Sequence, residues 1–335
     1  MNRIRRGFVA VPNPNNATRP SWRSLKPEAV EAIVFWTKDA RPLLPHLPEL
    51  RERGYCYYFQ YSLTRYPNWL EPRTPKGQDA IDAFWSASRA VGLGPDTVVW
   101  RYDPIFFLPD LDEDWHYEKF GEIASALRGA THRCVISFLD VFRKTAGNLK
   151  KAWQAEGSGS LDEHLRVRPD DMRAFGDRIG RIAEACDMEV VTCAEPTDVV
   201  EKLGPRVSAG RCIDVELLTT AGARKPSEAK DQGQREGCGC VVSRDIGMYD
   251  SCLHGCAYCY ATASRDAADR NQRTRHYPDS ASLLGRVADS DCPPRKATHA
   301  KPKSGGLKPA PTNSPTTKPK PAKPRKSRRQ DESLF

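Results

Sequence analysis

The sequence has no apolar run close to the roughly 18 residues that a membrane-spanning helix requires. Its first residues, MNRIRRGFVAVPNPNN, are basic but lack the apolar stretch of a secretory signal peptide. Both absences favour a cytoplasmic protein. In that reducing compartment we expect the eleven cysteines to be free thiols or metal ligands, because disulfide frameworks belong to oxidising compartments.

An excess of charge is also absent from most of the chain. The full sequence carries 52 Lys and Arg against 43 Asp and Glu, a net charge of +9. Residues 295–335 alone contain 12 basic and 2 acidic residues, so the rest of the chain is close to neutral. Electrostatic attraction to nucleic acid is therefore predicted for the terminal segment first.

From about residue 290 the sequence is rich in Lys and Pro and has almost no core-forming residues. Burial cannot offset the ordering entropy of such a segment, so we expect residues 290–335 to be disordered. The basic part, 295–329, is either a nucleic-acid-binding arm that neutralises phosphates or a solubilising tail. The final Ser-Leu-Phe is loosely similar to the peptides that dock on bacterial sliding clamps, which makes that clamp a further candidate partner.

Residues 1–221 alternate short β-branched and aromatic runs with apolar stripes at helical spacing. Five strands are predicted on this basis, at residues 31–39, 55–64, 96–105, 132–141 and 188–196. The alternation predicts a parallel α/β fold. Polar residues recur at the carboxyl ends of the strands, which favours a full or partial (β/α) barrel of the TIM type over a doubly wound sheet, although both folds place polar residues there.

These polar residues are candidates for a cofactor pocket at the mouth of the barrel. A cofactor with an α-amino and a carboxylate group needs an acidic and a basic partner, and Glu195 and Arg101 suit these roles. Structural ion pairs would explain the same residues. We expect Trp36 and Trp100 to pack against other residues rather than to stack on an adenine ring. The candidate set is Lys38, Arg101, Asp103, Asp140, Arg143 and Glu195.

Five of the eleven cysteines fall between residues 238 and 259. Cys252, Cys256 and Cys259 stand at C-x3-C-x2-C spacing in CLHGCAYCYA, and Cys238 and Cys240 lie upstream in GCGC. Thiolates at this density are typical of iron–sulfur or zinc sites. Three ligands would leave one iron of a [4Fe–4S] cluster open to a cofactor, whereas four would give a closed site. A structural zinc site that recruits Cys238 or Cys240 is the alternative.

Cys238 and Cys240 have several open interpretations. In the first interpretation they cap the fourth iron, in the second they bind a second metal, and in the third they form a redox pair. In the fourth they are free thiols in a flexible loop. The neighbouring glycines allow the backbone to approach a cluster closely. The other cysteines are scattered, and those in strand or helix patterns are expected to be small core residues, namely Cys56, Cys134, Cys186 and Cys193.

The stretch CLHGCAYCY resembles the cluster motif of radical S-adenosylmethionine enzymes, including Tyr258, the aromatic residue before the third cysteine. The resemblance implies that Cys252, Cys256 and Cys259 hold a [4Fe–4S] cluster. It also implies that S-adenosylmethionine binds the open iron and is cleaved to a 5′-deoxyadenosyl radical.

The chain as a whole resembles a bacterial family called domain of unknown function 1848. The stretches that carry this resemblance are VFWTKD, WRYDPI, CVISFLD and GCGCVVSRDIGMYDSCLHGCAYCYA, and together they cover roughly residues 1–265. The resemblance implies a radical-SAM-like cluster at the C-terminal end of the fold, and no established activity. Members of the family begin with an additional segment, so we expect the true start to lie upstream of Met1.

The sequence thus predicts a barrel-like body at 1–221, a cysteine-rich iron–sulfur segment at 222–289 that docks on it, and a tail at 290–335. Two functions follow. The first is a radical-SAM-like [4Fe–4S] enzyme of unknown substrate. The second is a non-enzymatic nucleic-acid-associated protein, stabilised by zinc or by a closed iron–sulfur site.

Overall fold

The computed structural model describes residues 1–11, 20–156, 159–235 and 237–287. The predicted disorder of residues 290–335, and the nucleic-acid and sliding-clamp predictions for the tail, lie outside these ranges. Within them, no helix combines the length and the apolar character needed to cross a membrane.

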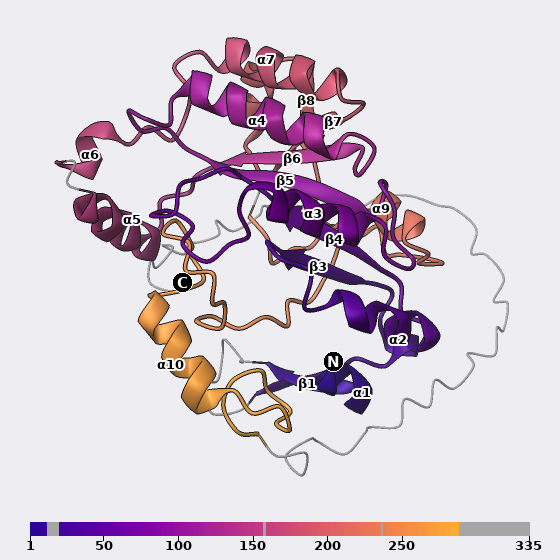
Figure 1. The fold of residues 1–335 in the computed structure, drawn as a ribbon. Helices are drawn as coiled ribbons and strands as arrows, with labels where there is room; N and C mark the ends of the chain where they lie inside the picture. Colours follow the sequence, from indigo (N-terminus) through magenta and orange to yellow (C-terminus); the bar gives the residue numbers. More distant parts are fainter. Residues whose placement is uncertain (12–19, 157–158, 236, 288–335) are drawn as a thin grey trace, which may run out of the picture. The chain divides into compact units, whose positions relative to one another are not determined.

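Six parallel strands form the central sheet, in the order in which they occur in the sequence (Figure 1). They are β3 (Ile33–Thr37), β4 (Tyr57–Ser62), β5 (Val98–Ile105), β6 (Arg133–Phe138), β7 (Glu189–Cys193) and β8 (Val207–Gly210). The first five coincide with the five predicted strands. Sequential order is the winding of a (β/α) barrel, whereas a doubly wound sheet reverses its order midway. The parallel α/β fold is confirmed, β3 and β8 stand at the two ends of the order, and the barrel stays a prediction.

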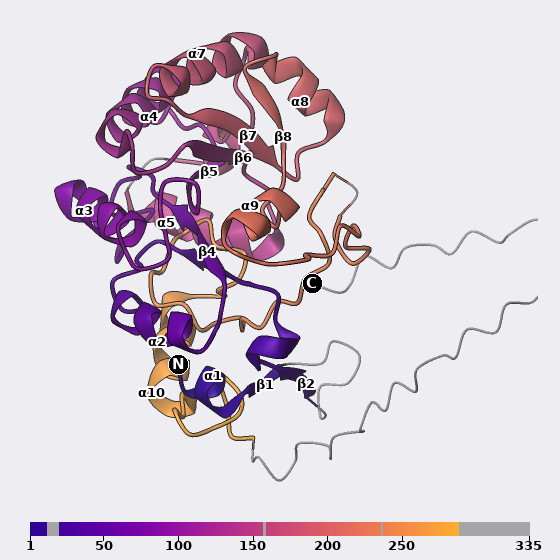
Figure 2. The ribbon, with the colours of Figure 1, turned by 90° about the vertical axis from the view of Figure 1, so that its right-hand side faces the viewer.

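One face of the sheet is covered by helices, as Figure 2 shows for α3, α4 and α7. The helices of this layer are α2 (Leu47–Glu52), α3 (Gly77–Ser88), α4 (Glu113–Leu127), α7 (Met172–Glu184) and α8 (Thr197–Leu203). In α7, for example, Phe175, Ile179 and Ala183 recur at helical spacing and are buried, and Asp171 caps the amino end by accepting a hydrogen bond from the Ala174 N–H. These helices pack on alternate strand residues such as Phe59.

The opposite face changes from apolar to polar along the strands. At its amino-terminal level α9 (Val215–Thr220) packs on an apolar layer of Tyr58, Val99, Val135 and Val191. Because side chains alternate between the faces of a strand, Gln60, Arg101, Asp103 and Cys193 share this face nearer the carboxyl ends. The face that holds α9 therefore presents polar and sulfur groups at the end where a barrel carries its chemistry.

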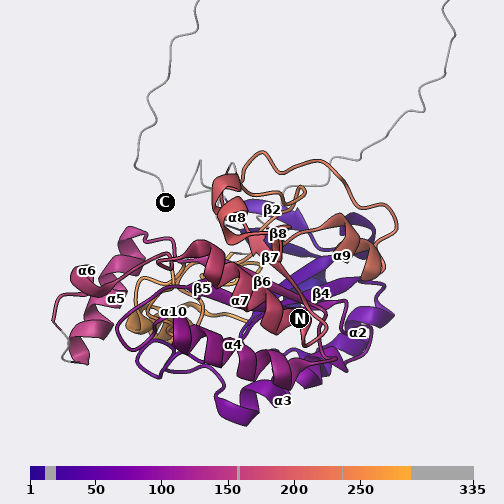
Figure 3. The ribbon, with the colours of Figure 1, turned by 90° about the horizontal axis from the view of Figure 1, so that it is seen from above.

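The remaining elements flank the sheet. A second sheet pairs β1 (Phe8–Val11) with β2 (Ser21–Ser24) in antiparallel register. Two 3-10 turns, Pro27–Ala29 and Leu44–His46, precede β3 and α2. Figures 1 and 3 show α5 and α10 at the same end of the main sheet. The short helices and these two are α1 (Asn2–Arg6), α5 (Arg143–Ala155), α6 (Leu161–His164) and α10 (Arg265–Arg275).

Candidate functional site

The segment 252–262, here named the cysteine loop, docks on the carboxyl ends of β4 and β5. Ala257 and Tyr258 are buried in an apolar cluster with Tyr66 and Phe106, residues that follow these two strands. The Ala257 N–H donates to the carbonyl of Leu70 at 2.8 Å, and the rings of Tyr258 and Tyr66 have centroids 5.7 Å apart. On its other side the loop meets α5, where the Asn148 amide donates to the Thr262 carbonyl at 3.1 Å. The loop is therefore held from several elements.

A buried carboxylate, that of Glu71, holds the cysteine loop in place through Tyr258. It accepts hydrogen bonds from the Tyr258 hydroxyl and from Thr64 Oγ1 at 2.6 Å, and its Oε1 lies 3.1 Å from Lys38 Nζ. Burial alone would raise the pKa of Glu71, but the Lys38 ammonium and these hydrogen bonds outweigh it and lower the pKa to about 2. Lys38 thus lies at the carboxyl end of β3 as a buried cation beside the cysteine loop.

Two of the three thiols of the loop, those of Cys252 and Cys256, lie close enough to Lys38 for its charge to act on them. Cys252 is exposed, whereas Cys256 and Cys259 are partly buried. Burial raises the pKa of Cys256 to about 12, and the charge of Lys38 opposes that rise. The donor type and number suit a thiolate-bound cluster. As they lie, however, no three His, Cys, Asp or Glu side chains in the described ranges form a set of metal ligands.

Arg101 and Asp103 form a buried ion pair on β5, next to the loop. Arg101 Nε lies 3.2 and 3.1 Å from the two carboxylate oxygens of Asp103, and Nη1 donates to Gln60 Oε1 at 3.2 Å. The same Nη1 lies 2.8 Å from Cys212 Sγ. Arg101 therefore has internal partners on both sides, as the structural ion-pair interpretation of the sequence expects.

Glu195 also has internal partners. Its carboxylate accepts the Phe138 N–H at 2.8 Å and an Arg168 N–H at 3.0 Å. Burial raises its pKa in spite of these two donors. Of the other predicted residues, Asp140 forms a more exposed ion pair with Arg235, and Arg143 is exposed at the first turn of α5. Lys38 and Glu195 lie just beyond the carboxyl ends of β3 and β7, whereas Arg101 and Asp103 lie within β5.

Sequence reasoning missed two features of this region. Cys193 and Cys212 contact Cys238 and Cys240, although they looked like isolated cysteines in the sequence. The prediction that Trp36 packs against other residues holds only in part, because 50% of it is exposed, whereas Trp100 is fully buried as expected. The alternation of side chains along the strands could have indicated part of this, because it places Trp36 and Cys193 on the same face of the sheet as the polar residue Arg101.

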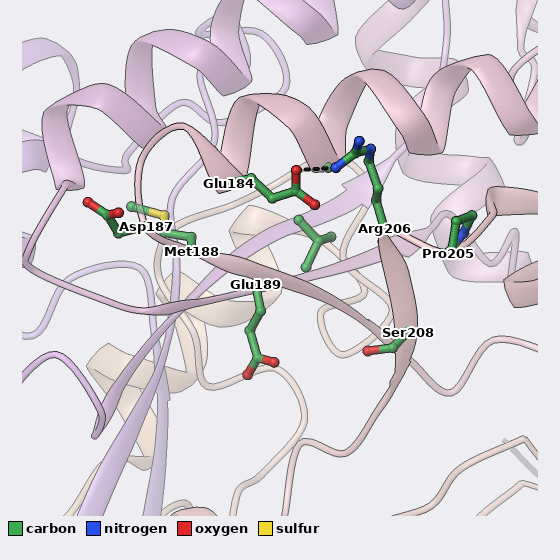
Figure 4. Close-up of a pocket in the computed structure, with 9 residues that line it drawn as sticks. Glu184, Asp187, Met188, Glu189, Pro205, Arg206 and Ser208 are labelled. Carbon is green, nitrogen blue, oxygen red and sulfur yellow. Dashed lines mark hydrogen bonds and ion pairs between the residues drawn. The ribbon is translucent and has the colours of Figure 1, made fainter.

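Two surface cavities lie away from the cysteine loop. One, of about 460 Å³, opens at the amino ends of β7 and β8, where Glu184 and Arg206 form an ion pair (Figure 4). It contains no predicted site residue and lies at the end of the sheet opposite the chemistry-bearing side chains. The other, of about 410 Å³, lies between α8 and β8 and reaches only Glu195 of the predicted set. We therefore place the candidate site at the cysteine loop and the polar face beside it.

Comparison with known proteins gives little functional information. No curated protein matches the chain. Among solved structures it is similar to a Thermus thermophilus protein, TTHB071, described as soaked with ZnCl2, with 11% identity and a TM-score of 0.28, over 52% of this chain and 63% of that chain. That likeness is too distant to carry an argument. A family model described as domain of unknown function (DUF1848) matches residues 1–261, and the chain therefore belongs to the DUF1848 family.

Proposed function

We propose that this protein is a [4Fe–4S] enzyme of the radical-SAM type, with Cys252, Cys256 and Cys259 as the cluster ligands. The observation that carries the proposal is the position of the cysteine loop. Tyr258 and Ala257 bury it on the carboxyl ends of the parallel strands, where (β/α) folds assemble their active sites. A metal site with a purely structural role does not require a position at the carboxyl ends of the strands.

The surroundings of the three thiols favour a thiolate cluster. A thiol must lose its proton to bind a metal, and Lys38 is a buried cation whose charge favours the thiolate of Cys256. Lys38 is itself fixed by Glu71, which also holds Tyr258 within the loop. When bound, the cluster would supply one-electron reduction chemistry.

The polar face next to the loop supports a small-molecule cofactor. Arg101 and Asp103 place an ion pair there, and Glu195, which accepts hydrogen bonds from the Phe138 N–H and Arg168, supplies a carboxylate with a raised pKa. Trp36 exposes half of its surface from the same face of the sheet, and it is the size of platform on which a purine stacks. S-adenosylmethionine contains an α-amino group, a carboxylate and an adenine, so these side chains match its chemical groups.

The competing function is a zinc-stabilised binding protein. To separate the two, the full chain is purified without oxygen, its iron, sulfide and zinc are measured, and S-adenosylmethionine and dithionite are then added. We expect iron and sulfide, and reductive formation of 5′-deoxyadenosine that the substitution Cys256→Ser abolishes. Cys186→Ser is the matched control, because Cys186 lies just beyond the end of α7. Stoichiometric zinc without iron would contradict the proposal.

A further inference from the structure

Four cysteines from separate parts of the chain meet at the carboxyl ends of β7 and β8. Cys193 is the last residue of β7, Cys212 follows β8, and Cys238 and Cys240 come from the GCGC stretch. The four residues pack together in one cluster, in which Cys193 lies against Cys212, Cys238 and Cys240. These residues belong to a different cluster from Cys256, which packs with Tyr258.

Glycines bring the GCGC stretch close to the sheet. A Cβ atom at Gly237 would lie 3.1 Å from the carbonyl oxygen of Glu195 and 3.2 Å from that of Ala194. A Cβ atom at Gly239 would lie 3.2 Å from Cγ of Arg211. Both separations are tighter than most real Cβ contacts, and at Gly237 the neighbours are backbone atoms, so a side chain there would push the stretch away from β7; at Gly239 the neighbour is the Arg211 side chain, which would have to move. The glycines are thus needed to place the two cysteines where they lie.

Hydrogen-bond donors lie beside two of the four sulfur atoms, those of Cys212 and Cys240. The Arg101 guanidinium lies 2.8 Å from Cys212 Sγ, and the Ile213 N–H donates to Cys240 Sγ at 3.3 Å. The Cys212 carbonyl is itself fixed by two donors, the Tyr58 hydroxyl at 2.6 Å and the Gln60 amide at 2.9 Å. N–H groups directed at sulfur, and a cation beside it, stabilise thiolates rather than thiols. Buried neutral thiols would not need this environment.

We propose that Cys193, Cys212, Cys238 and Cys240 are the four ligands of a second metal site, independent of the cysteine loop, which holds one Zn²⁺ ion. Four thiolates are a complete tetrahedral set for zinc. Zn–S bonds of about 2.3 Å place the sulfur atoms of such a site about 3.8 Å apart, which is close to contact between thiols. A cubane iron–sulfur cluster would hold its thiolates farther apart, so the mutual contacts favour a single ion.

Closing the site requires the thiols to rearrange. As they lie, the four side chains do not form a ligand set in the described part of the chain. Rotation of the cysteine side chains would have to bring the four sulfur atoms around one ion, with release of their protons. The resulting site would carry two net negative charges, and Arg101, of which only 7% of the side chain is exposed, lies ready to offset them.

The test separates this site from the cysteine loop. The full chain and its triple variant Cys252→Ser, Cys256→Ser, Cys259→Ser are purified and analysed for metals. We expect about one zinc per chain in both proteins, because a tetrathiolate site binds one ion. Cys212→Ser and Cys240→Ser should lose this zinc, and Cys186→Ser should keep it. Loss of the zinc in the triple variant would overturn the proposal, as would retention of iron and sulfide in that variant.

A second measurement does not depend on the folding of single-cysteine variants. The triple variant is alkylated with iodoacetamide before and after treatment with a zinc chelator, and each cysteine is followed by mass spectrometry. The four proposed ligands should react slowly with zinc bound and at least tenfold faster after chelation, whereas Cys56 should react at the same rate in both samples. Equal rates at the four cysteines with and without chelator would refute the site.

Discussion

Replacement of Glu71 by Gln tests how the cysteine loop is anchored. Glu71 is 2% exposed and binds the Lys38 ammonium and the Tyr258 hydroxyl at once. The substitution Glu71→Gln keeps the shape of the side chain and removes its charge. Lys38 is then left buried without its carboxylate, and removal of one partner from a buried pair costs about 3–5 kcal/mol of the free energy of unfolding.

The pH dependence of unfolding gives a second value for the free energy that the ionised Glu71 carboxylate contributes to stability. The pKa of Glu71 is lowered from an ordinary value of 4.5 to about 2, because Lys38 and the hydrogen bonds outweigh the effect of burial. A shift of this size corresponds to about 3 kcal/mol of stability. Because the folded pKa is the lower one, this stability is present above pH 4.5 and is lost as the pH falls towards 2. The variant has no carboxyl group at this position and should not show that loss.

The assay is urea unfolding of both proteins at pH 7 and at several pH values between 5 and 2.5. Tyr258→Phe serves as a control that keeps the charge pair and removes one hydrogen bond to a charged group, which costs about 1.5–3 kcal/mol. At pH 7 we expect Glu71→Gln to be less stable than Tyr258→Phe, and the gap between wild type and Glu71→Gln to narrow below pH 4.5. A Glu71→Gln protein within about 1 kcal/mol of wild type at pH 7, or a gap that does not change with pH, would refute this reasoning.

Three further predictions concern other parts of the fold. Gly176→Ala should lower the melting temperature despite a gain in helix propensity of about 1 kcal/mol, because its Cβ would lie 2.1 Å from the Leu203 carbonyl oxygen; an unchanged melting curve would contradict this contact. Gly237→Ala should weaken zinc retention, measured by competition with a chelator, whereas unaltered retention would show that the GCGC stretch has room to spare. Trp36→Ala should change the free energy of unfolding by less than about 1 kcal/mol and reduce binding of S-adenosylmethionine in calorimetry, and a large loss of stability would show that Trp36 is a packing residue.

The strands could be predicted from the sequence where burial dictates composition. Strands β4 to β7 are largely buried runs of β-branched and aromatic residues, which is the pattern of a parallel sheet, and β3 has the same composition although it is only partly buried. Strand β8, Val-Ser-Ala-Gly, gave no signal because Ser208 and Ala209 are exposed and Gly210 has no side chain; a Cβ at Gly210 would lie 2.6 Å from Val191 Cγ2. Helix α10 has almost no apolar stripe, so periodicity gave no signal for it.

Part of the candidate site could also be predicted from the sequence, and part of it could not. The C-x3-C-x2-C spacing is local, so these three cysteines could be singled out as candidate ligands from the sequence alone. The four-cysteine cluster is formed by tertiary contacts between β7, the end of β8 and the GCGC stretch, and no local pattern links them. Similarly, Glu71 follows β4 at a distance and was not singled out, because only its contact with Tyr258 makes it important.

The central claim is that Cys252, Cys256 and Cys259 hold an iron–sulfur cluster. The most direct measurement is the iron and acid-labile sulfide content of the anaerobically purified chain, compared with that of the triple Ser variant of these residues. We predict about four irons and four sulfides per wild-type chain and neither in the variant, as the composition of a [4Fe–4S] cluster requires. Wild-type protein without iron and sulfide, or a variant that retains both, would contradict the claim.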